Sequence, residues 1–497
     1  MSRFKFDAEY DLVVIGGGAS GKMAAYIGAK EGGLSVALLE KMEETGGTSI
    51  YAEGQAAFNS SEQLERKVPP QYTGTAFDHY PTYAEGFARY MDYSHQRANP
   101  DVVRMQLYNT AETIDIMKGL GITYTDVLIY AFYQQNELNT FHRPDGLGVH
   151  MQEVLLRAAI NAGVDIFTST PAKKILMEDG HVVGVQALDR KSGAKMVVGA
   201  KAVIIATGGF GNNPELVRKY AWQYRNADFT DQITPTENIG DGLNMAVHVG
   251  ADTDNIGALM NIPCARGKDI SAHTTGGGLQ PNLWVNKNGL RFCTEEVAFS
   301  FMNAGSSIIK QPDCTTYAIL DSAQVQYYMD EGSDIGLGDF IGYKQKLSRL
   351  LTELEQDVTD GLAWKGDTPE ELAASIGDID QEQFVKTFNQ YNDFCDKGDD
   401  PDFFKQSRWL HPIRQAPFYA IEMTASVLVS CGGIRVNGNL QVTDKDYKPI
   451  PGLYAVGMDA SGLYGDAYNL DVPGTANGFA HASGRVAARH VIATLKG

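Results

Sequence analysis

The amino-acid sequence predicts an α/β fold, and three observations support this prediction. Nearly continuous apolar runs at Asp11–Ile15, Leu34–Leu39 and Lys201–Ala206 are typical of strands in a buried parallel sheet. Between the first two runs, Ala19–Lys30 consists mostly of residues that favour a helix, and the Gly32-Gly33 pair ends it. Glycine clusters directly follow the first and the last run. Strand, helix and strand in this order form a βαβ unit with parallel strands.

The bulk composition argues against several classes of protein. Of the 497 residues, 43% are apolar and 21% are charged, as in ordinary globular proteins. The net charge of −19 should repel phosphate backbones and acidic membrane surfaces, so we expect no nucleic-acid or membrane partner. There is no run of about 18 apolar residues and no signal-peptide core within Met1–Tyr10, which indicates a cytoplasmic protein. The five cysteines show no CxxC, CxxCH or zinc-type spacing, so no metal site is expected.

The rest of the chain predicts a second domain that interrupts the first. Several short strands are expected within Val164–Val198, and the composition becomes mixed beyond them. Strand and glycine signals then return and lead to a last helix at Ala476–Leu495. We therefore expect a dinucleotide-binding domain in two parts, residues 1–254 and 423–497, with an inserted domain of residues 255–422. Further helices are expected at Asp101–Leu120, Gly148–Ala162 and Thr368–Gln390.

A dinucleotide-binding motif lies between the first strand and the first helix. The run Gly16-Gly17-Gly18-Ala19-Ser20-Gly21 fits GxGxxG, in the structural context that the motif requires. Gly16 permits the tight turn, Gly18 lets the backbone approach a pyrophosphate, and Gly21 lets helix and strand pack closely. The free N–H groups at the helix N-terminus then face the phosphates. Glu40 ends the second strand at the spacing of an acid that holds ribose hydroxyls and disfavours a 2′-phosphate.

Two further glycine turns favour FAD over NAD. Thr45-Gly46-Gly47-Thr48-Ser49 follows the second strand, and Ala206-Thr207-Gly208-Gly209 ends a later one. Glycine turns at strand ends allow the backbone to come close to a cofactor. Each of these glycine-rich segments, taken alone, more often serves only to reverse the chain. The order and spacing of all the glycine motifs together indicate FAD.

Taken together, these motifs resemble the flavoprotein family of fumarate reductases, succinate dehydrogenases and 3-ketosteroid Δ1-dehydrogenases. The resemblance covers almost the whole chain, in runs such as DLVVIGGGASG, LLEKMEETGGTS, VIIATGGFGNN, PNLWVNKNGLRF and PIPGLYAVG. It implies a Rossmann-type FAD-binding domain interrupted by an α+β capping domain, with the active site in the cleft between them. By this resemblance the residues expected to contact FAD are Gly16, Gly18, Ala19, Ser20, Gly21, Glu40, Lys41, Thr45, Gly47, Thr48, Ala172, Thr207, Gly208, Asp459 and Ala476.

The family also bears on how FAD is held. Members that bind FAD covalently use a histidine close to the Thr-Gly-Gly turn, where this chain has Thr48-Ser49-Ile50. Non-covalent FAD is therefore expected. The glutamate that usually follows the GLYAVG-like strand is absent, and Asp459 is expected to take its place.

The groups with which fumarate reductases bind a dicarboxylate are largely missing. By alignment of motifs, Phe299 stands where the family has its proton-donating arginine, Leu428-Val429 replaces a histidine pair, and Tyr468 replaces a late arginine. Each lost charge-assisted hydrogen bond removes about 1.5–3 kcal/mol. Fumarate or succinate is thus a poor candidate substrate. We expect a neutral, ring-bearing molecule, with Phe299 and Leu428 in the substrate site.

The candidate catalytic residues come from the end of the chain and from one loop. In the ketosteroid dehydrogenases a tyrosine hydroxyl and a glycine N–H polarise the substrate carbonyl, and Tyr468 and Gly474 match this pair with four extra residues between them. Tyr464 and His273 are further candidates for proton transfer. His273 lies in Ser271–Gly278, which is expected to be a flexible loop that closes over the cleft.

The expected reaction is hydride transfer from N5 of the reduced flavin to an electron-poor carbon of a neutral enone, steroid or isoflavonoid. The run LLEKMEETGGTSIYAEG resembles the tetrahydrodaidzein reductase group, which reductively removes a benzylic hydroxyl to give equol. With no second nucleotide motif, haem motif or iron–sulfur cysteines, electrons should come from a separate reductase or from NAD(P)H. A homo-oligomer is compatible with the sequence.

Three alternatives remain at this point. The first is outward electron flow, as in a 3-ketosteroid Δ1-dehydrogenase. The second is a dicarboxylate reductase that uses arginines outside the family positions, such as Arg143 and Arg266. The third is a non-catalytic flavin electron carrier, against which the large inserted domain argues.

Overall fold

The expected α/β fold is confirmed by an eight-stranded sheet that contains the predicted βαβ unit. The computed structural model describes residues 3–68, 74, 78–128, 137–224, 236–338 and 340–497. Along its main path the sheet has the strand order β17-β18-β9-β1-β2-β6, and β8 and β7 continue from β9. The strands are β1 (Ala8–Ile15), β2 (Val36–Leu39), β6 (Asp165–Phe167), β7 (Ala172–Glu178), β8 (His181–Leu188), β9 (Lys195–Ile205), β17 (Gln441–Thr443) and β18 (Pro449–Ala455).

The centre of this sheet is parallel and buried, as the apolar runs predict. Val13 of β1 pairs with Ala37 of β2 on one side and with Val203 of β9 on the other. All three side chains are fully buried. Helix α1 packs against α14 and α5. The helices of this part, which we call the nucleotide lobe, are α1 (Ala19–Lys30), α2 (Ser61–Glu65), α3 (Tyr83–Tyr93), α4 (Pro100–Gly119), α5 (Leu147–Asn161), α6 (Pro214–Tyr220), α7 (Asp241–His248) and α14 (Thr475–Lys496).

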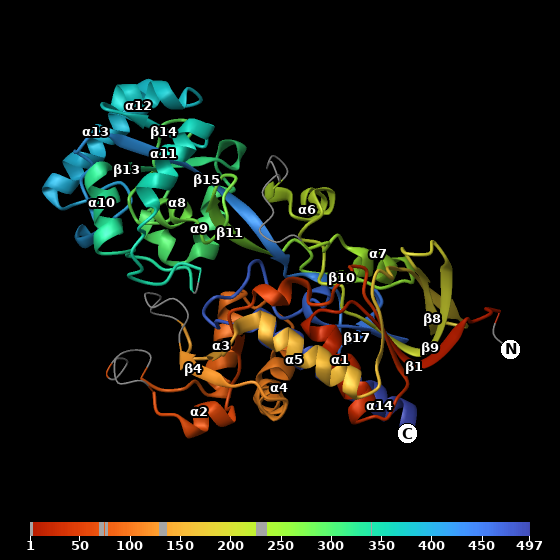
Figure 1. The fold of residues 1–497 in the computed structure, drawn as a ribbon. Helices are drawn as coiled ribbons and strands as arrows, with labels where there is room; N and C mark the ends of the chain where they lie inside the picture. Colours follow the sequence, from red (N-terminus) through yellow and green to blue (C-terminus); the bar gives the residue numbers. More distant parts are fainter. Residues whose placement is uncertain (1–2, 69–73, 75–77, 129–136, 225–235, 339) are drawn as a thin grey trace.

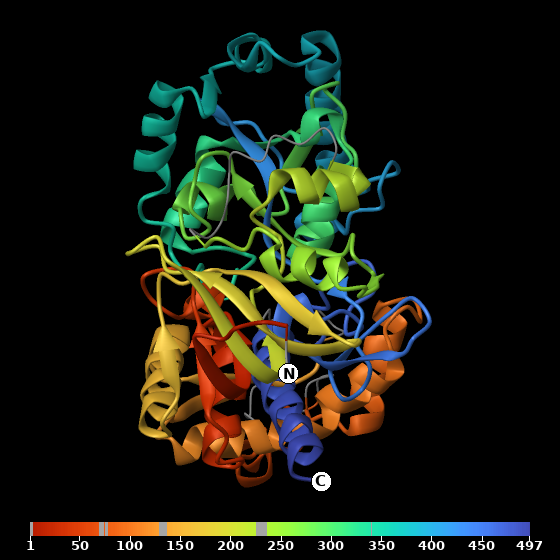
Figure 2. The same ribbon diagram turned by 90° about the vertical axis from the view of Figure 1, so that its right-hand side faces the viewer.

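A second, antiparallel sheet forms the centre of the cap lobe, which stands above the nucleotide lobe in Figure 2. Its main path has the order β11-β15-β13-β12, and β14 pairs with the beginning of β15. The strands are β11 (Leu259–Ala265), β12 (Leu283–Asn286), β13 (Thr316–Asp321), β14 (Ala363–Gly366) and β15 (Phe418–Ser430). The helices are α8 (His273–Gly278), α9 (Phe301–Ile308), α10 (Ser322–Asp330), α11 (Leu350–Asp360), α12 (Pro369–Ile376) and α13 (Gln381–Lys397).

Strand β15 connects the two lobes (Figure 1). It begins in the cap sheet. At its other end, the Ser430 hydroxyl accepts a hydrogen bond at 3.0 Å from the backbone N–H of Phe210, which follows β9 in the chain. Two small sheets lie in the nucleotide lobe, β3-β5-β4 and β10-β16. Their strands are β3 (Gln55–Ala56), β4 (Tyr124–Leu128), β5 (Phe141–Pro144), β10 (Thr253–Asp254) and β16 (Gly433–Ile434).

The structure differs from the sequence expectations in two helical segments. The helix expected at Thr368–Gln390 is two helices, because Gly377 ends α12 at φ +73° and Asp380 caps α13 by accepting from the Gln383 N–H. Ser271–Gly278 contains helix α8 instead of a loop. The expected boundary after residue 254 falls between β10 and β11, whereas the one after residue 422 falls inside β15. No helix of the described residues is long and apolar enough to cross a membrane.

Candidate active site at the junction of two cavities

The first cavity is a groove at the carboxyl ends of β1, β2 and β9, with an open volume of about 1670 Å³. Three glycine turns of the sequence motifs meet here, at Gly16–Gly18, Thr45–Gly47 and Ala206–Gly208. Carboxyl ends of parallel strands are where α/β sheets bind ligands. The expected cofactor residues that line the groove are Gly16, Gly18, Ala19, Ser20, Glu40, Lys41, Thr45, Gly47, Thr48, Ala172, Thr207 and Gly208.

The glycines of the first turn have different physical roles. Gly16 has φ +108°, and a Cβ there would lie 2.2 Å from the carbonyl oxygen of Ala206. A Cβ on Gly21 would lie 1.9 Å from the carbonyl oxygen of Gly16, so Gly21 serves packing and does not line the groove. The space in front of Gly18 is open, since the nearest atom to a Cβ there is 3.9 Å away. Gly18 is also the N-cap of α1 and has no side-chain cap, so helix N–H groups face this space.

Glu40 is fixed at the end of β2 beside this space. Its carboxylate accepts hydrogen bonds from the backbone N–H groups of Gly17 and Met42, both at 2.8 Å. Lys41 is held at the groove wall by an ion pair with Asp241 at 2.8 Å. A carboxylate here accepts from ribose hydroxyls and repels a 2′-phosphate. The open space at Gly18, the helix N-terminus and Glu40 together fit the pyrophosphate and ribose of FAD, whose isoalloxazine supplies two-electron redox chemistry.

Asp459, which the resemblance places near FAD, is not among the residues that line the groove. Its buried carboxylate accepts hydrogen bonds from the N–H groups of Gly208 at 2.9 Å and Gly209 at 3.2 Å, and from the backbone N–H and hydroxyl of Thr207. Burial raises the pKa of Asp459 to about 6, although these hydrogen bonds oppose the shift. Asp459 therefore shapes the turn that lines the groove.

Replacement of Asp459 by asparagine tests this role. The pKa of Asp459 is higher in the folded protein than its ordinary value of 3.8, so the folded state binds more protons between about pH 4 and about pH 6. The free energy of unfolding of the natural protein should therefore fall as the pH rises through this window, by on the order of 3 kcal/mol. In Asp459→Asn this fall should be missing, as measured by denaturant unfolding at pH 4, 5, 6 and 7. An unchanged difference between pH 4 and pH 6 would show that the carboxyl does not titrate there.

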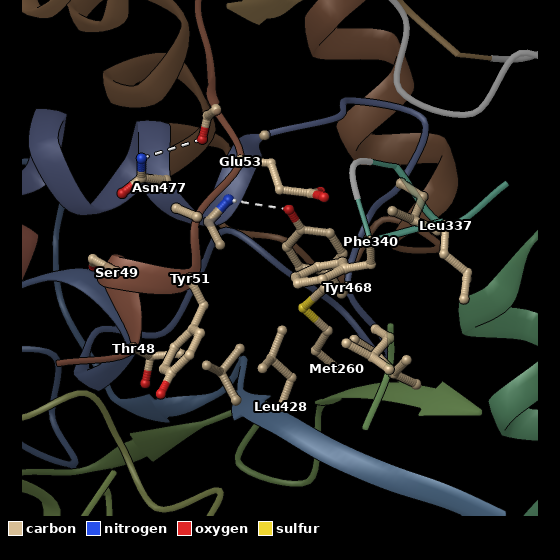
Figure 3. A pocket seen from close by; sticks show the side chains of 18 of the residues that line it. Thr48, Ser49, Tyr51, Glu53, Met260, Leu337, Phe340, Leu428, Tyr468 and Asn477 are labelled. Atoms are coloured by element: carbon tan, nitrogen blue, oxygen red, sulfur yellow. Dashed lines mark hydrogen bonds between the residues drawn. The ribbon is translucent and has the colours of Figure 1, made fainter. Parts of the chain in front are cut away.

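The second cavity is a cleft between the two lobes, with an open volume of about 1180 Å³. It shares Thr48, Ser49, Tyr51, Val429, Met458 and Ala480 with the groove, so the two cavities adjoin each other. The cap lobe supplies apolar walls, and Figure 3 shows Met260, Leu337, Phe340 and Leu428 around the cleft. Among the described residues that line it there is no lysine, arginine or histidine. Its carboxyl groups are Glu53 and Asp269.

Tyr468 and the N-terminus of α14 form the polar end of the cleft. The Tyr468 hydroxyl accepts a hydrogen bond from the backbone N–H of Ala476 at 3.3 Å, which leaves its own O–H free to donate (Figure 3). Burial raises the pKa of Tyr468, so the side chain stays protonated. Gly474 is the N-cap of α14 at φ +80°, and a Cβ there would lie 2.7 Å from the backbone N of Ala56. Tyr468, Gly474 and Ala476 all line the cleft, and Ala476 does not line the groove.

Three other candidates lie elsewhere. Tyr464 does not line the cleft, and its ring centroid is 5.4 Å from that of Tyr468. His273 is the first residue of α8, is buried, and accepts a hydrogen bond from the Arg349 N–H at 3.0 Å, so it is neither in a loop nor in the cleft wall. Phe299 packs its ring 5.1 Å from Trp409 and does not line the cleft, where Phe301 lies instead. The phenylalanine that lines the cleft is thus two positions later in the chain than the one expected, and it is the first residue of α9.

Sequence reasoning missed much of the cleft wall. Tyr51, Glu53 and Gly54 line it, although their run, Tyr51–Gly54, served only as part of a family resemblance. Phe340 and Ile270 come from irregular segments whose sequence carries no motif. The one available signal was the position of Tyr51–Gly54 a few residues after the Thr-Gly-Gly turn that lines the groove.

The comparisons with known proteins agree with this geometry. A family model described as an FAD binding domain matches residues 11–471. The chain is 32% identical to vinyl phenol reductase of Lactiplantibacillus plantarum, over 99% of this chain and 97% of that protein. The open conformation of a flavocytochrome c3 fumarate reductase matches 98% of this chain and 79% of that chain, at 25% identity and a TM-score of 0.72. A 3-ketosteroid Δ1-dehydrogenase from Sterolibacterium denitrificans matches 98% of this chain and 100% of that chain, at 19% identity and a TM-score of 0.76.

These matches bear on the cofactor and on the reaction class. The FAD expected from the glycine turns is confirmed by the family model, which covers both parts of the nucleotide lobe. The named relatives are reductases and a dehydrogenase. The chain therefore belongs to the FAD binding domain family, and it is an FAD-dependent oxidoreductase similar to the fumarate reductases and 3-ketosteroid dehydrogenases.

Proposed function

We propose that this protein reduces a neutral, ring-bearing organic molecule, by hydride addition to an electron-poor carbon in the cleft. The observation that carries the proposal is the chemistry of the cleft wall, which is apolar and aromatic and has no cationic side chain among the described lining residues. An apolar site with a few directed polar groups binds neutral ring systems by burial of apolar surface. Bound reduced FAD supplies the hydride.

The same wall argues against a dicarboxylate substrate. Neither of the two arginines proposed as substitutes lines the cleft. Arg266 forms an ion pair with Glu422 at 2.6 Å and donates to the Thr315 hydroxyl at 3.0 Å. Glu53 and Asp269 would repel a second carboxylate in the cleft. A small diacid would lose its hydration there without gaining a charged partner.

Tyr468 is the residue that we propose for proton transfer. Its hydroxyl keeps its proton, accepts the Ala476 N–H, and lines the cleft. A hydrogen bond accepted by a phenol oxygen makes its own O–H a stronger donor, because adjacent hydrogen bonds polarise one another. Donation of this proton to the substrate balances the negative charge that a hydride brings.

The relatives narrow the substrate class further. Vinyl phenol reductase, by its name, acts on a phenol that bears a vinyl group, which is a small neutral aromatic molecule. The tetrahydrodaidzein reductase resemblance points to a larger neutral phenol. We propose a phenolic or enone substrate on these grounds, and electrons from a separate reductase or from NAD(P)H.

An anaerobic re-oxidation experiment tests the proposal. The FAD of the purified holoenzyme is reduced with light and then mixed with 4-vinylphenol, a steroid enone, an isoflavonoid or fumarate, while the flavin absorbance is followed. We expect at least one neutral compound to re-oxidise the flavin at least 100-fold faster than fumarate, because fumarate lacks charged partners in the cleft. Faster re-oxidation by fumarate would overturn the proposal. Bleaching of the oxidised flavin by a saturated 3-ketosteroid, without added reductant, would favour the desaturase alternative instead.

A further inference from the structure

Glu53 is a buried carboxyl group in the wall of the substrate cleft. The residue is 8% exposed, whereas Asp269, the other carboxyl of the cleft, lies at the exposed rim. The Asp269 carboxylate accepts from the N–H and the hydroxyl of Ser271 at 2.8 and 2.6 Å, which closes a local turn. Glu53 is thus the acidic group that a molecule inside the cleft meets.

The backbone around Glu53 is fixed to the same helix end that holds Tyr468. The Gly54 carbonyl accepts a hydrogen bond from the side-chain amide of Asn477 at 3.2 Å, and the Ala56 N–H donates to the Gly474 carbonyl at 2.8 Å. A Cβ on Gly54 would lie 2.6 Å from the ring of Phe141, so the backbone packs closely against this ring. Figure 3 shows Glu53 and Tyr468 both lining the pocket. The cleft therefore presents an acid side chain and a protonated phenol, and the chain segments that carry both are hydrogen-bonded to the N-terminal turn of α14.

We infer that Glu53 accepts the hydrogen bond, and then the proton, of a phenolic hydroxyl on the substrate, and that it thereby selects phenols conjugated to the reacting carbon. This inference rests on the proposed function. An ionised carboxylate only accepts hydrogen bonds and offers about four lone-pair positions, so it pairs with a hydroxyl donor and not with a ketone oxygen. A hydrogen bond to an ionised acceptor is also about twice as strong as a neutral one.

The proton movements balance for a phenol with a vinyl group para to the hydroxyl. The phenol O–H bond breaks and its proton passes to the Glu53 carboxylate, while the Tyr468 O–H bond breaks and its proton forms a C–H bond at the outer vinyl carbon. The substrate is then a neutral quinone methide, whose carbon next to the ring is electron-poor. That carbon accepts the hydride, the ring becomes aromatic again, and Glu53 returns its proton to the phenol oxygen. Tyr468 regains a proton from solvent, so the substrate gains one hydride and one proton in total.

A benzylic alcohol para to a phenol reaches the same kind of intermediate. There the proton from Tyr468 leaves with the benzylic hydroxyl as water, and Glu53 again takes the phenol proton. Hydride addition then replaces the C–O bond by a C–H bond. One acid and one base in the cleft thus account for reduction of a vinyl phenol and for removal of a benzylic hydroxyl.

The test compares two ligands of which only one has a phenolic O–H to donate. Oxidised holoenzyme is titrated with 4-ethylphenol and with its methyl ether, 4-ethylanisole, and binding is followed by the change in flavin absorbance. We expect 4-ethylphenol to bind roughly 10- to 150-fold more tightly, as one charge-assisted hydrogen bond implies. In Glu53→Gln this preference should disappear, with FAD content and the far-UV circular dichroism spectrum unchanged. The matched control Asp269→Asn, at the rim of the same cleft, should keep the preference.

Two results would overturn the inference: equal binding of phenol and ether by the natural protein, or an unchanged preference in Glu53→Gln. If Glu53→Gln does not fold, equal binding of 4-ethylphenol and 4-ethylanisole by the natural protein still overturns the inference. Re-oxidation of the photoreduced enzyme separates this inference from the proposed function. If 4-vinylanisole re-oxidises the flavin as fast as 4-vinylphenol does, Glu53 has no such role while the proposed function stands. If fumarate re-oxidises the flavin faster than every neutral compound does, the proposed function itself fails.

Discussion

Replacement of Tyr468 by phenylalanine is expected to slow the re-oxidation of reduced flavin by substrate by roughly 10²- to 10⁴-fold, the range for loss of a general acid. The ring of Tyr468 packs in the cleft wall, and phenylalanine keeps that ring while it removes the donor. FAD content should change little, because the groove does not include Tyr468. The measurement is single-turnover re-oxidation by stopped-flow absorbance under anaerobic conditions.

Tyr464→Phe is the matched control for this experiment. Tyr464 is a buried tyrosine from the same segment, but it lies behind Tyr468 and does not line the cleft. The flavin of the Tyr464→Phe variant should be re-oxidised by substrate at a rate within several-fold of the rate in the natural protein. Because burial raises the pKa of Tyr468, the natural protein should not lose its rate through ionisation of this group at mildly alkaline pH. A Tyr468→Phe variant with the natural rate would assign the proton transfer to another group.

Replacement of Gly18 by alanine is expected to leave the fold intact and to weaken FAD binding by roughly 5- to 150-fold, as overpacking by one methyl group implies. The backbone of Gly18 has φ −76° and ψ −168°, which alanine adopts without strain. The nearest atom to the added Cβ would be 3.9 Å away. The methyl group therefore clashes with no protein atom, and it occupies the space that faces the α1 N-terminus. Bound flavin per chain, measured by absorbance after dialysis, reports the effect.

Gly21→Ala gives the contrasting result. Its Cβ would lie 1.9 Å from the Gly16 carbonyl oxygen and 3.2 Å from the Ala206 side chain. We expect little folded protein, with or without FAD. A Gly18→Ala variant that unfolds would mean that Gly18 serves the fold, and one that binds FAD normally would mean that the pyrophosphate lies elsewhere. Thermal unfolding with and without added FAD distinguishes these outcomes, because a ligand stabilises only the state that binds it.

Local sequence was sufficient where neighbouring residues decide the conformation. Gly16, Gly18 and Glu40 belong to a single strand-turn-helix-strand unit, so spacing alone predicted that they meet at one groove. Spacing could not reveal the contacts of Asp459, because its partners in the Thr207–Gly209 turn are about 250 residues away in the chain. A motif position indicates that a residue lies near the cofactor. It does not indicate which way the side chain points.

The sequence by itself determined the α/β fold, the FAD groove and the shortage of cations in the substrate site, since these follow from strand periodicity, glycine spacing and missing residue types. Only the tertiary structure decided which side chains face the cleft. It excluded Phe299 and His273, whose side chains pack within the cap lobe, and it included Glu53 and Phe301. The physical reason is that the cleft is formed by two lobes whose segments are distant in sequence, so the direction of each side chain depends on packing that no local pattern specifies.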